Sequence, residues 1–149
     1  GKSHPGVTVV TQNIDGMHQR AGSGKVIELH GSLWRLLCPE HGITEDIGEK
    51  YRRFRCERCG NWLRPDIVWF GDMLDQYVMS AAIAAIRSCD LFVSIGTSGV
   101  VYPAAGFPSF AKGNEARCIE INPEANVISS LYDEAIREPA GKALPELFA

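Results

Sequence analysis

Two pairs of metal-ligating residues stand in the middle of the chain. Cys38 and His41 are separated by two residues, and so are Cys56 and Cys59. Each pair can hold one ion from a tight turn, and four soft or borderline ligands suit tetrahedral Zn²⁺ in a closed, structural site. The spacing therefore predicts structural zinc. The alternative is an eroded site, in which Cys38 is a buried thiol and His41 a separate surface residue.

A histidine at the end of a predicted strand is a candidate general base. His30 closes the apolar run 26–30, and Gly31 follows it, where a backbone can come close to a ligand. An imidazole with an ordinary pKa near ~6.5 accepts a proton at neutral pH. His4 and His18 have no such context. The residue pattern alone leaves a structural role for His30 open as well.

The elements that must position these residues alternate along the chain. Apolar, β-branched runs predict strands at residues 6–12, 26–30, 33–37, 65–71, 90–95, 117–121 and 135–137. Helices are predicted at 14–20, 75–88 (with Asp75 as N-cap), 102–112 and 140–147. This alternation predicts an α/β fold, with a mostly parallel sheet and helices on both faces.

Polar residues follow three of these strands. They are Gln12 and Asn13, residues 96–98, and Asn122 with Pro123. Ligands of open α/β sheets lie off the carboxyl ends of the strands, so we expect these clusters to converge on one crevice. Residues 38–63 are charged, turn-rich and bounded by cysteines, which predicts a small zinc-ribbon-like module inserted into a main domain formed by residues 1–37 and 64–149. Cys89 and Cys118 lie in apolar segments and are predicted to be core residues.

Composition excludes several classes of protein. The 149 residues carry 15 basic and 18 acidic side chains, a net charge of −3, and the only cluster of basic residues is the run 52–55. Nucleic-acid binding by phosphate neutralisation is therefore not expected. The apolar runs at 67–70 and 91–95 are too short to cross a bilayer, so no membrane partner is expected. No secretory leader opens the chain, and five cysteines spaced for a metal suit a reduced, cytoplasmic protein.

Four segments resemble the motifs of the sirtuins in order and spacing. They are TQNIDGMH at 11–18, LHGS at 29–32, LRPDIVWFGD at 63–72 and GTSGVVYPAA at 96–105. The resemblance runs from Val7 almost to Ala149 and implies a Rossmann-like NAD-binding domain with a zinc insert. The sequence of residues 68–71 and 96–106 is most similar to that of the sirtuin class that includes desuccinylases.

The resemblance also implies an activity and the residues that perform it. A sirtuin uses NAD to remove acyl groups from protein lysines, giving nicotinamide and O-acyl-ADP-ribose. His30 would be the general base on the ribose hydroxyls. The resemblance places the nicotinamide half of NAD at Gln12, Asn13 and Asp15, and the adenosine half at Gly96, Thr97, Ser98 and Asn122. The acyl-lysine peptide would be bound by Val68, Trp69, Phe70, Gly71, Gly99 and Val100. The alternative for Trp69 and Phe70 is a place in the core.

The chain departs from the family pattern at its start. A complete sirtuin opens with a strand, a Gly-Ala-Gly-x-Ser phosphate loop and a Gly-Ile-Pro-x-Phe-Arg segment, and none of these is present in the 149 residues. We therefore expect this chain alone to bind NAD poorly and to have little activity. Two other functions remain open: a non-catalytic, zinc-stapled interaction module and a protein ADP-ribosyltransferase.

Overall fold

The structure is a computed structural model that describes residues 6–44, 50–51, 53–69 and 71–148. The chain divides into two compact units, residues 1–82 and residues 83–149, and the division falls within helix α2.

A short parallel pair of strands opens the first unit. Strand β1 (Val9–Thr11) pairs in parallel with β2 (Val26–Glu28), so that Thr11 lies opposite Glu28. Helix α1 (Met17–Arg20) lies in the crossover between them. The predicted helix at 14–20 starts later because Gly16 has a φ of 69°, outside the helical region, and the Asp15 carboxylate accepts a hydrogen bond from the Met17 N–H.

An antiparallel sheet forms the rest of this unit. Strand β3 (Gly31–Cys38) lies between β4 (Gly42–Ile43) and β5 (Arg64–Ile67), and its pairing with β5 shifts register between Ser32 and Leu36. The sequence predicts a strand at 65–71, but β5 ends at Ile67. The prediction is wrong for the residues after Ile67, because the Asp72 N–H donates to the Trp69 carbonyl and Gly71 has a φ of 95°, which turns the chain.

Helix α2 (Gln76–Arg87) follows the cap that the sequence predicts. The Asp75 carboxylate accepts hydrogen bonds from the N–H groups of Tyr77 at 2.8 Å and Val78 at 3.0 Å. Two residues four positions apart, Ala82 and Ile86, are buried and mark the apolar face of the helix.

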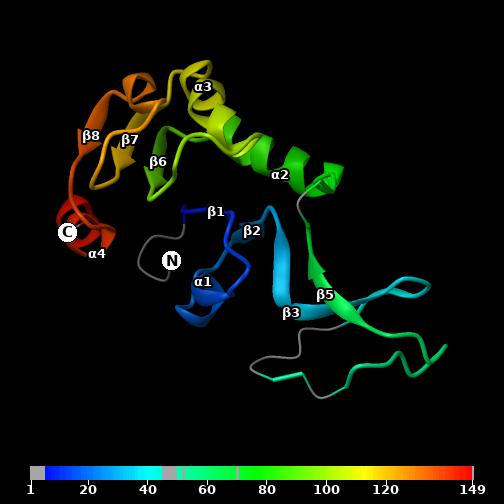
Figure 1. The fold of residues 1–149 in the computed structure, drawn as a ribbon. Coiled ribbons are helices and arrows are strands. Elements are labelled where there is room, and N and C mark those ends of the chain that lie inside the picture. Colours follow the sequence, from blue (N-terminus) through cyan, green and yellow to red (C-terminus); the bar gives the residue numbers. More distant parts are fainter. Residues whose placement is uncertain (1–5, 45–49, 52, 70, 149) are drawn as a thin grey trace. The chain divides into compact units, whose positions relative to one another are not determined.

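The second unit is a parallel α/β sheet in the order β6 (Leu91–Ile95), β7 (Arg117–Ile121) and β8 (Glu134–Ile136) (Figure 1). Alternate residues of β7 face opposite sides. Ile119 and Ile121 pack with Ala143 of helix α4 (Ala140–Leu147). On the other side the Cys118 thiol donates to the carbonyl of Pro108 in helix α3 (Phe107–Lys112). Helices thus cover both faces, as predicted.

Two further expectations need correction. The predicted helix at 102–112 is divided into a 3₁₀ turn, η1 (Ala104–Gly106), and α3, since Pro108 has no N–H for the helical ladder. A second 3₁₀ turn, η2 (Ser129–Leu131), precedes β8.

Cys118 is fully buried as predicted, but Cys89 is only half-buried because it lies just beyond α2, where its thiol donates to the Ile86 carbonyl. No helix in the described ranges has the length and apolar composition needed to cross a bilayer.

Candidate metal centre and cofactor site

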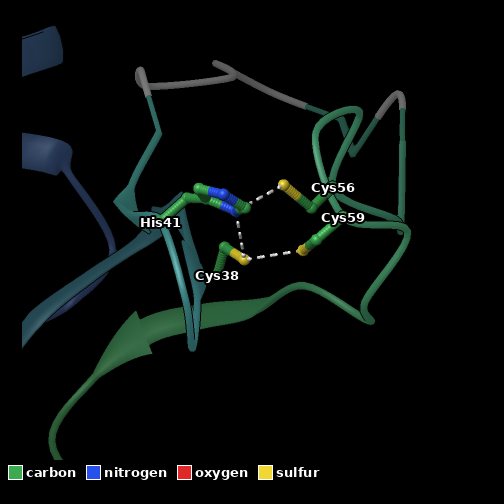
Figure 2. Close-up of side chains that lie close together, drawn as sticks. All are labelled: Cys38, His41, Cys56 and Cys59. Carbon is green, nitrogen blue, oxygen red and sulfur yellow. Dashed lines mark hydrogen bonds between the residues drawn. The ribbon is translucent and has the colours of Figure 1, made fainter.

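The four predicted metal ligands converge on one point (Figure 2). Cys38 ends strand β3 and His41 lies in the turn to β4, while Cys56 and Cys59 come from a separate turn. Their ligand atoms all lie within 4.8 Å of one another. His41 is exposed as a residue, but its Nδ1 lies 3.6 Å from the Cys38 sulfur and 3.5 Å from the Cys56 sulfur. It is therefore not the separate surface residue of the alternative interpretation.

The spacing of these atoms fits tetrahedral zinc. Zn–S bonds of about 2.3 Å and Zn–N bonds of about 2.05 Å give tetrahedral edges of about 3.8 Å between two sulfurs and about 3.6 Å between sulfur and nitrogen. The sulfurs of Cys38 and Cys59 are 3.6 Å apart, and both sulfur–nitrogen distances agree with the second value. Three thiols and one imidazole form a closed set of four ligands, which is the composition of a structural site.

Local hydrogen bonds shape the turn that presents Cys56 and Cys59. The Cys56 N–H donates to the Asn61 carbonyl, and the Gly60 N–H donates to the Cys56 carbonyl. The backbone N–H groups of Arg58 and Cys59 lower the pKa of the Cys56 thiol to about 6, which favours the thiolate that binds metal. The Asn61 amide also donates to the Glu40 carboxylate at 3.0 Å, which ties this turn to the one that holds His41.

The backbone around His30 is fixed on both sides. The N–H of the preceding Leu29 donates to the Thr11 carbonyl, and the Val68 N–H donates to the His30 carbonyl at 3.0 Å. Gly31 has a φ of 75°, and a Cβ there would lie 2.1 Å from the Asp66 carbonyl oxygen. Only glycine fits this crossing, so the residue after the histidine is dictated by packing as well as by backbone conformation.

The loop that follows β1 is held against Trp34. The indole N–H donates to the Asp15 carbonyl at 2.6 Å, and a Cβ on Gly16 would lie 2.9 Å from the same ring. The Asn13 N–H donates to the Thr11 hydroxyl. The predicted residues Gln12, Asn13, Asp15 and His30 thus all belong to the first unit, on segments anchored to β1, β2 and β3.

A partly buried ion triad joins the strands that carry these segments. Arg35 reaches Glu28 at 2.5 Å and Asp66 at 2.9 Å, which links β2, β3 and β5 through side chains. Burial alone would lower the pKa of Arg35, but the hydrogen bonds that it donates to the carboxylates of Glu28 and Asp66 raise it. The triad keeps the Asp66 backbone, which crosses Gly31, in place.

The second unit contains a polar pocket of about 310 Å³ off the carboxyl ends of β6 and β7. It is lined by residues 96–98, Asn122 and residues 124–126. Two of the clusters that the strand-end rule predicts are therefore brought together here. The sequence did not predict Glu124, Ala125 and Asn126 as pocket residues, because only the residues directly after the strand, Asn122 and Pro123, were considered.

Side-chain amides hold the floor of this pocket. The Thr97 carbonyl accepts hydrogen bonds from the amide of Asn122 at 2.9 Å and from the amide of Asn126 at 3.0 Å. The Thr97 hydroxyl lies 3.2 Å from the hydroxyl of Ser94. Both the carbonyl and the hydroxyl of one threonine are thus constrained, and the pocket presents hydroxyl and amide groups beside apolar surface.

The predicted peptide-binding residues have different surroundings. Val68 is half-buried, Trp69 is 55% exposed, and Gly71 is exposed, while Phe70 lies outside the described residues. Trp69 is therefore not a core aromatic. In the second unit Gly99 is buried with a φ of 72°, and Val100 is 60% exposed.

The fold and the two sites define a class of protein: an α/β domain with a polar pocket at its strand ends and a Cys₃His metal cluster. Residues 2–103 match the model of the Sir2 family. The chain belongs to the Sir2 family.

Relatives and solved structures agree with this assignment. The chain is 43% identical to an NAD-dependent protein deacylase of Aquifex aeolicus, over 97% of this chain and 62% of the relative. It is 46% identical to NAD-dependent protein deacylase 2 of Pyrobaculum aerophilum, over 93% and 57%. A Sir2 homolog–NAD complex has a TM-score of 0.86 at 38% identity, over 95% of this chain and 56% of that one. The chain thus spans about three fifths of the length of its curated relatives.

Proposed function

We propose that this chain is part of an enzyme that removes acyl groups from protein lysines with NAD as co-substrate. The observation that carries the proposal is the pocket at residues 96–98 and 122–126, in a chain whose relatives are named NAD-dependent protein deacylases and whose structural neighbour is an NAD complex. In this reaction the acyl group passes to ADP-ribose and nicotinamide is released.

His30 is proposed as the general base that takes a proton from a ribose hydroxyl. Support comes from its fixed backbone between Leu29 and the Asp66 crossing, since a base must be held within hydrogen-bonding reach of its proton. Gln12, Asn13 and Asp15 are proposed to bind the ribose and nicotinamide end. The anchoring of Asp15 by Trp34 supports this, because such a contact limits how far the loop can move.

The adenosine half is proposed to bind at Gly96, Thr97, Ser98 and Asn122. The pocket offers hydroxyl and amide groups suited to hydrogen-bond a nucleoside. Gly96 has a φ of 60°, and no atom lies within 4 Å of the point where a Cβ would stand, which leaves room for a ligand to approach the backbone closely. A pocket of about 310 Å³ is of the size that holds part of a dinucleotide.

The acyl-lysine peptide is proposed to add as a strand along Val68, Trp69 and Gly71 and to be bound by Gly99 and Val100 as well. Val68 and Phe70, of which Phe70 lies outside the described residues, are proposed to line the acyl-lysine tunnel. Strand addition uses main-chain hydrogen bonds and therefore accepts many sequences. Trp69 and Val100 are exposed, which supports access of a peptide to these segments. A solved Sir2–p53 peptide–NAD⁺ complex, with a TM-score of 0.82 and 30% identity, supports a peptide substrate.

Zinc is proposed to bind Cys38, His41, Cys56 and Cys59 and to stabilise residues 38–63 as a module inserted in the NAD-binding domain of residues 1–37 and 64–149. These residues hold the ion and take no part in the chemistry. Cysteines spaced for a metal support a reducing, cytoplasmic location, which cell fractionation of the tagged protein would test.

The activity is tested by joining the chain to the N-terminal segment of the Aquifex relative and supplying NAD with acetyl- or succinyl-lysine peptide. We expect nicotinamide and O-acyl-ADP-ribose from the extended chain, little from the 149 residues alone, and a loss of about 10²–10⁴-fold in His30→Ala. His18→Ala is the matched control and should remain active.

Three results would contradict the proposal. Unchanged turnover in His30→Ala would remove the general base. Labelled ADP-ribose retained on the protein substrate would favour ADP-ribosyl transfer, and zinc binding without any turnover of NAD would favour the interaction module.

A further inference from the structure

We infer that Glu120, Asn126 and Arg137 form a positioning network that sets the shape of the pocket at residues 96–98 and thereby its affinity for adenosine. This inference rests on the proposed function, because it takes that pocket as the site of the adenosine half of NAD. None of the three residues is assigned a direct role in the chemistry; they act through Thr97 and through the turn that follows β7.

Asn126 is the centre of the network. Its side-chain nitrogen donates to the Thr97 carbonyl at 3.0 Å and to the Glu120 carboxylate at 2.8 Å, and its side-chain oxygen accepts from the Ile128 N–H at 2.9 Å. Both amide hydrogens and the oxygen are thus engaged, which fixes the amide in one orientation. An aspartate of the same shape would place an oxygen against two acceptors.

Glu120 supplies the negative charge that holds Asn126. Its side chain is 2% exposed, and its Oε2 lies 2.7 Å from the Arg137 guanidinium. Among the described residues this Oε2 accepts no hydrogen bond of good geometry, so the carboxylate is only partly compensated for the loss of water. A buried and partly compensated charge is a poor source of stability. Its visible effect is to orient Asn126 and Arg137.

Arg137 extends the network to the other wall of the pocket. The same guanidinium nitrogen that faces Glu120 donates to the carbonyls of Asn122 and Glu124, each at 3.2 Å. These two residues line the pocket. One carboxylate therefore holds the loop after β6 through Asn126 and the loop after β7 through Arg137.

Close packing leaves Asn126 little freedom to move. A Cβ on Gly99 would lie 2.8 Å from the Asn126 side-chain oxygen and 2.6 Å from the Ile128 side chain. The network also lies on the opposite face of β7 from the core residues Ile119 and Ile121, since β7 residues alternate. Pocket shape and core stability can therefore be separated by mutation.

The test is an NMR titration of the 149-residue chain with AMP, following the amide signals of Gly96, Thr97 and Ser98, alongside urea unfolding of each variant. We expect Asn126→Ala to raise the Kd for AMP at least about tenfold, which corresponds to one or two lost hydrogen bonds. Asn126→Asp should raise it further by repulsion. Arg137→Lys keeps the charge but changes the length and geometry of the donor group, and it should raise the Kd only about threefold.

Two controls separate positioning from stability. Arg117→Gln removes an exposed ion pair with Glu134 on the same sheet, and Ile119→Val weakens the core on the other face. Both should leave the Kd within about twofold of the parent value, although Ile119→Val lowers unfolding stability.

The outcomes distinguish failure of the network from failure of the proposed function. AMP shifts at residues 96–98 with an unchanged Kd in Asn126→Ala and Arg137→Lys would overturn the network and leave the proposed function standing. An increase in Kd in Ile119→Val equal to that in Asn126→Ala would also overturn it. No AMP shift at residues 96–98 at ~20 mM AMP, both in the parent chain and in the chain extended by the N-terminal segment of the Aquifex relative, would overturn both, since an adenosine site binds its nucleotide in the millimolar range or below.

Discussion

Gly31 leaves no room for a side chain. Its φ of 75° disfavours any side chain, and a Cβ would lie 2.1 Å from the Asp66 carbonyl oxygen. A positive φ alone costs about 1–2 kcal/mol, whereas a clash with backbone also forces β3 and β5 apart. We predict that Gly31→Ala lowers the free energy of unfolding by more than about 3 kcal/mol, measured by urea denaturation in excess zinc.

Gly42→Ala is the matched control. Gly42 has the same φ of 75°, but nothing lies within 4 Å of its Cβ position, so we expect a loss of only about 1 kcal/mol. Equal losses in the two variants would show that the approach of Asp66 contributes nothing.

Asp133 gives the second unit a dependence on pH. Its carboxylate accepts the Cys118 N–H at 2.8 Å and pairs with Lys112 at 3.0 Å, and these contacts lower the pKa of the carboxyl below its ordinary value of 3.8. A lowered folded-state pKa means that the stabilisation is fully present above the unfolded pKa and is lost as the pH falls through the folded pKa.

We therefore predict that Asp133→Asn is less stable than the parent chain at pH 7 and that the difference shrinks as the pH falls below about 4. Urea midpoints at a series of pH values measure this. A difference that stayed constant from pH 7 to pH 2.5 would rule out the carboxylate charge as the cause.

At the scale of the elements, the turn 56–60 and the turn at His41 need an ion to hold them together. We predict one zinc per chain by elemental analysis, a loss of stoichiometric zinc in Cys56→Ser, and retention in His41→Cys, since four thiolates also suit tetrahedral zinc. Cys89→Ser is the control, because Cys89 lies outside the cluster. Full zinc content in Cys56→Ser would contradict the assignment.

The first turn of helix α2 is stabilised by an N-cap residue that the sequence predicts. Asp75 accepts two N–H groups of the first turn, so Asp75→Ala should cost about 1 kcal/mol and speed hydrogen exchange at Tyr77 and Val78. Gln76→Ala, one residue further on, should do neither. Unchanged exchange at both amides in Asp75→Ala would show that the cap does not stabilise the helix.

Residue patterns predicted most elements because local signals and packing agree in them. The bounds of β7 and α4 match those expected, since an apolar run and a short amphipathic segment each have one way to bury their side chains. The predicted bounds were wrong where one residue or turn interrupts a run of apolar or helix-forming residues. Gly16 delays α1, Pro108 divides the helix after Tyr102, and the Trp69–Asp72 turn ends β5 early.

The metal cluster was predictable from spacing, whereas the pocket network was not. Two pairs of ligands, each with two residues between its members, indicate a shared metal ion. The link from Glu120 to Thr97 through Asn126 spans separate segments, and only the pairing of β6 with β7 brings them together. A glutamate within an apolar strand was the one available signal, because such a residue is rarely buried without a partner.

At the scale of the whole molecule, the four metal ligands and the three tryptophans, Trp34, Trp62 and Trp69, all belong to the first unit. Arg55 stacks on Trp62 at 4.0 Å, next to the Cys56 turn. The core of the second unit is formed by its own residues, Ile119, Ile121 and Ala143.

We therefore predict that a chelator changes the tryptophan fluorescence while leaving hydrogen exchange at β6 and β7 nearly unchanged. Adding zinc back should restore the emission, and the Cys56→Ser variant should show no response to chelator. Loss of amide protection in Ile119 and Ile121 on chelation would mean that the metal stabilises both units together.

The side chains of β7 alternate between the two faces of the sheet, which limits where the chain can gain or lose a residue. Deleting one residue between Arg117 and Ile119 would move Glu120 onto the isoleucine face and push an isoleucine toward α3. Insertions and deletions are therefore expected to be rejected within β7. They are expected to accumulate in the turn before it, at residues 113–115, where the side chains are exposed and Glu115 already has a φ of 63°.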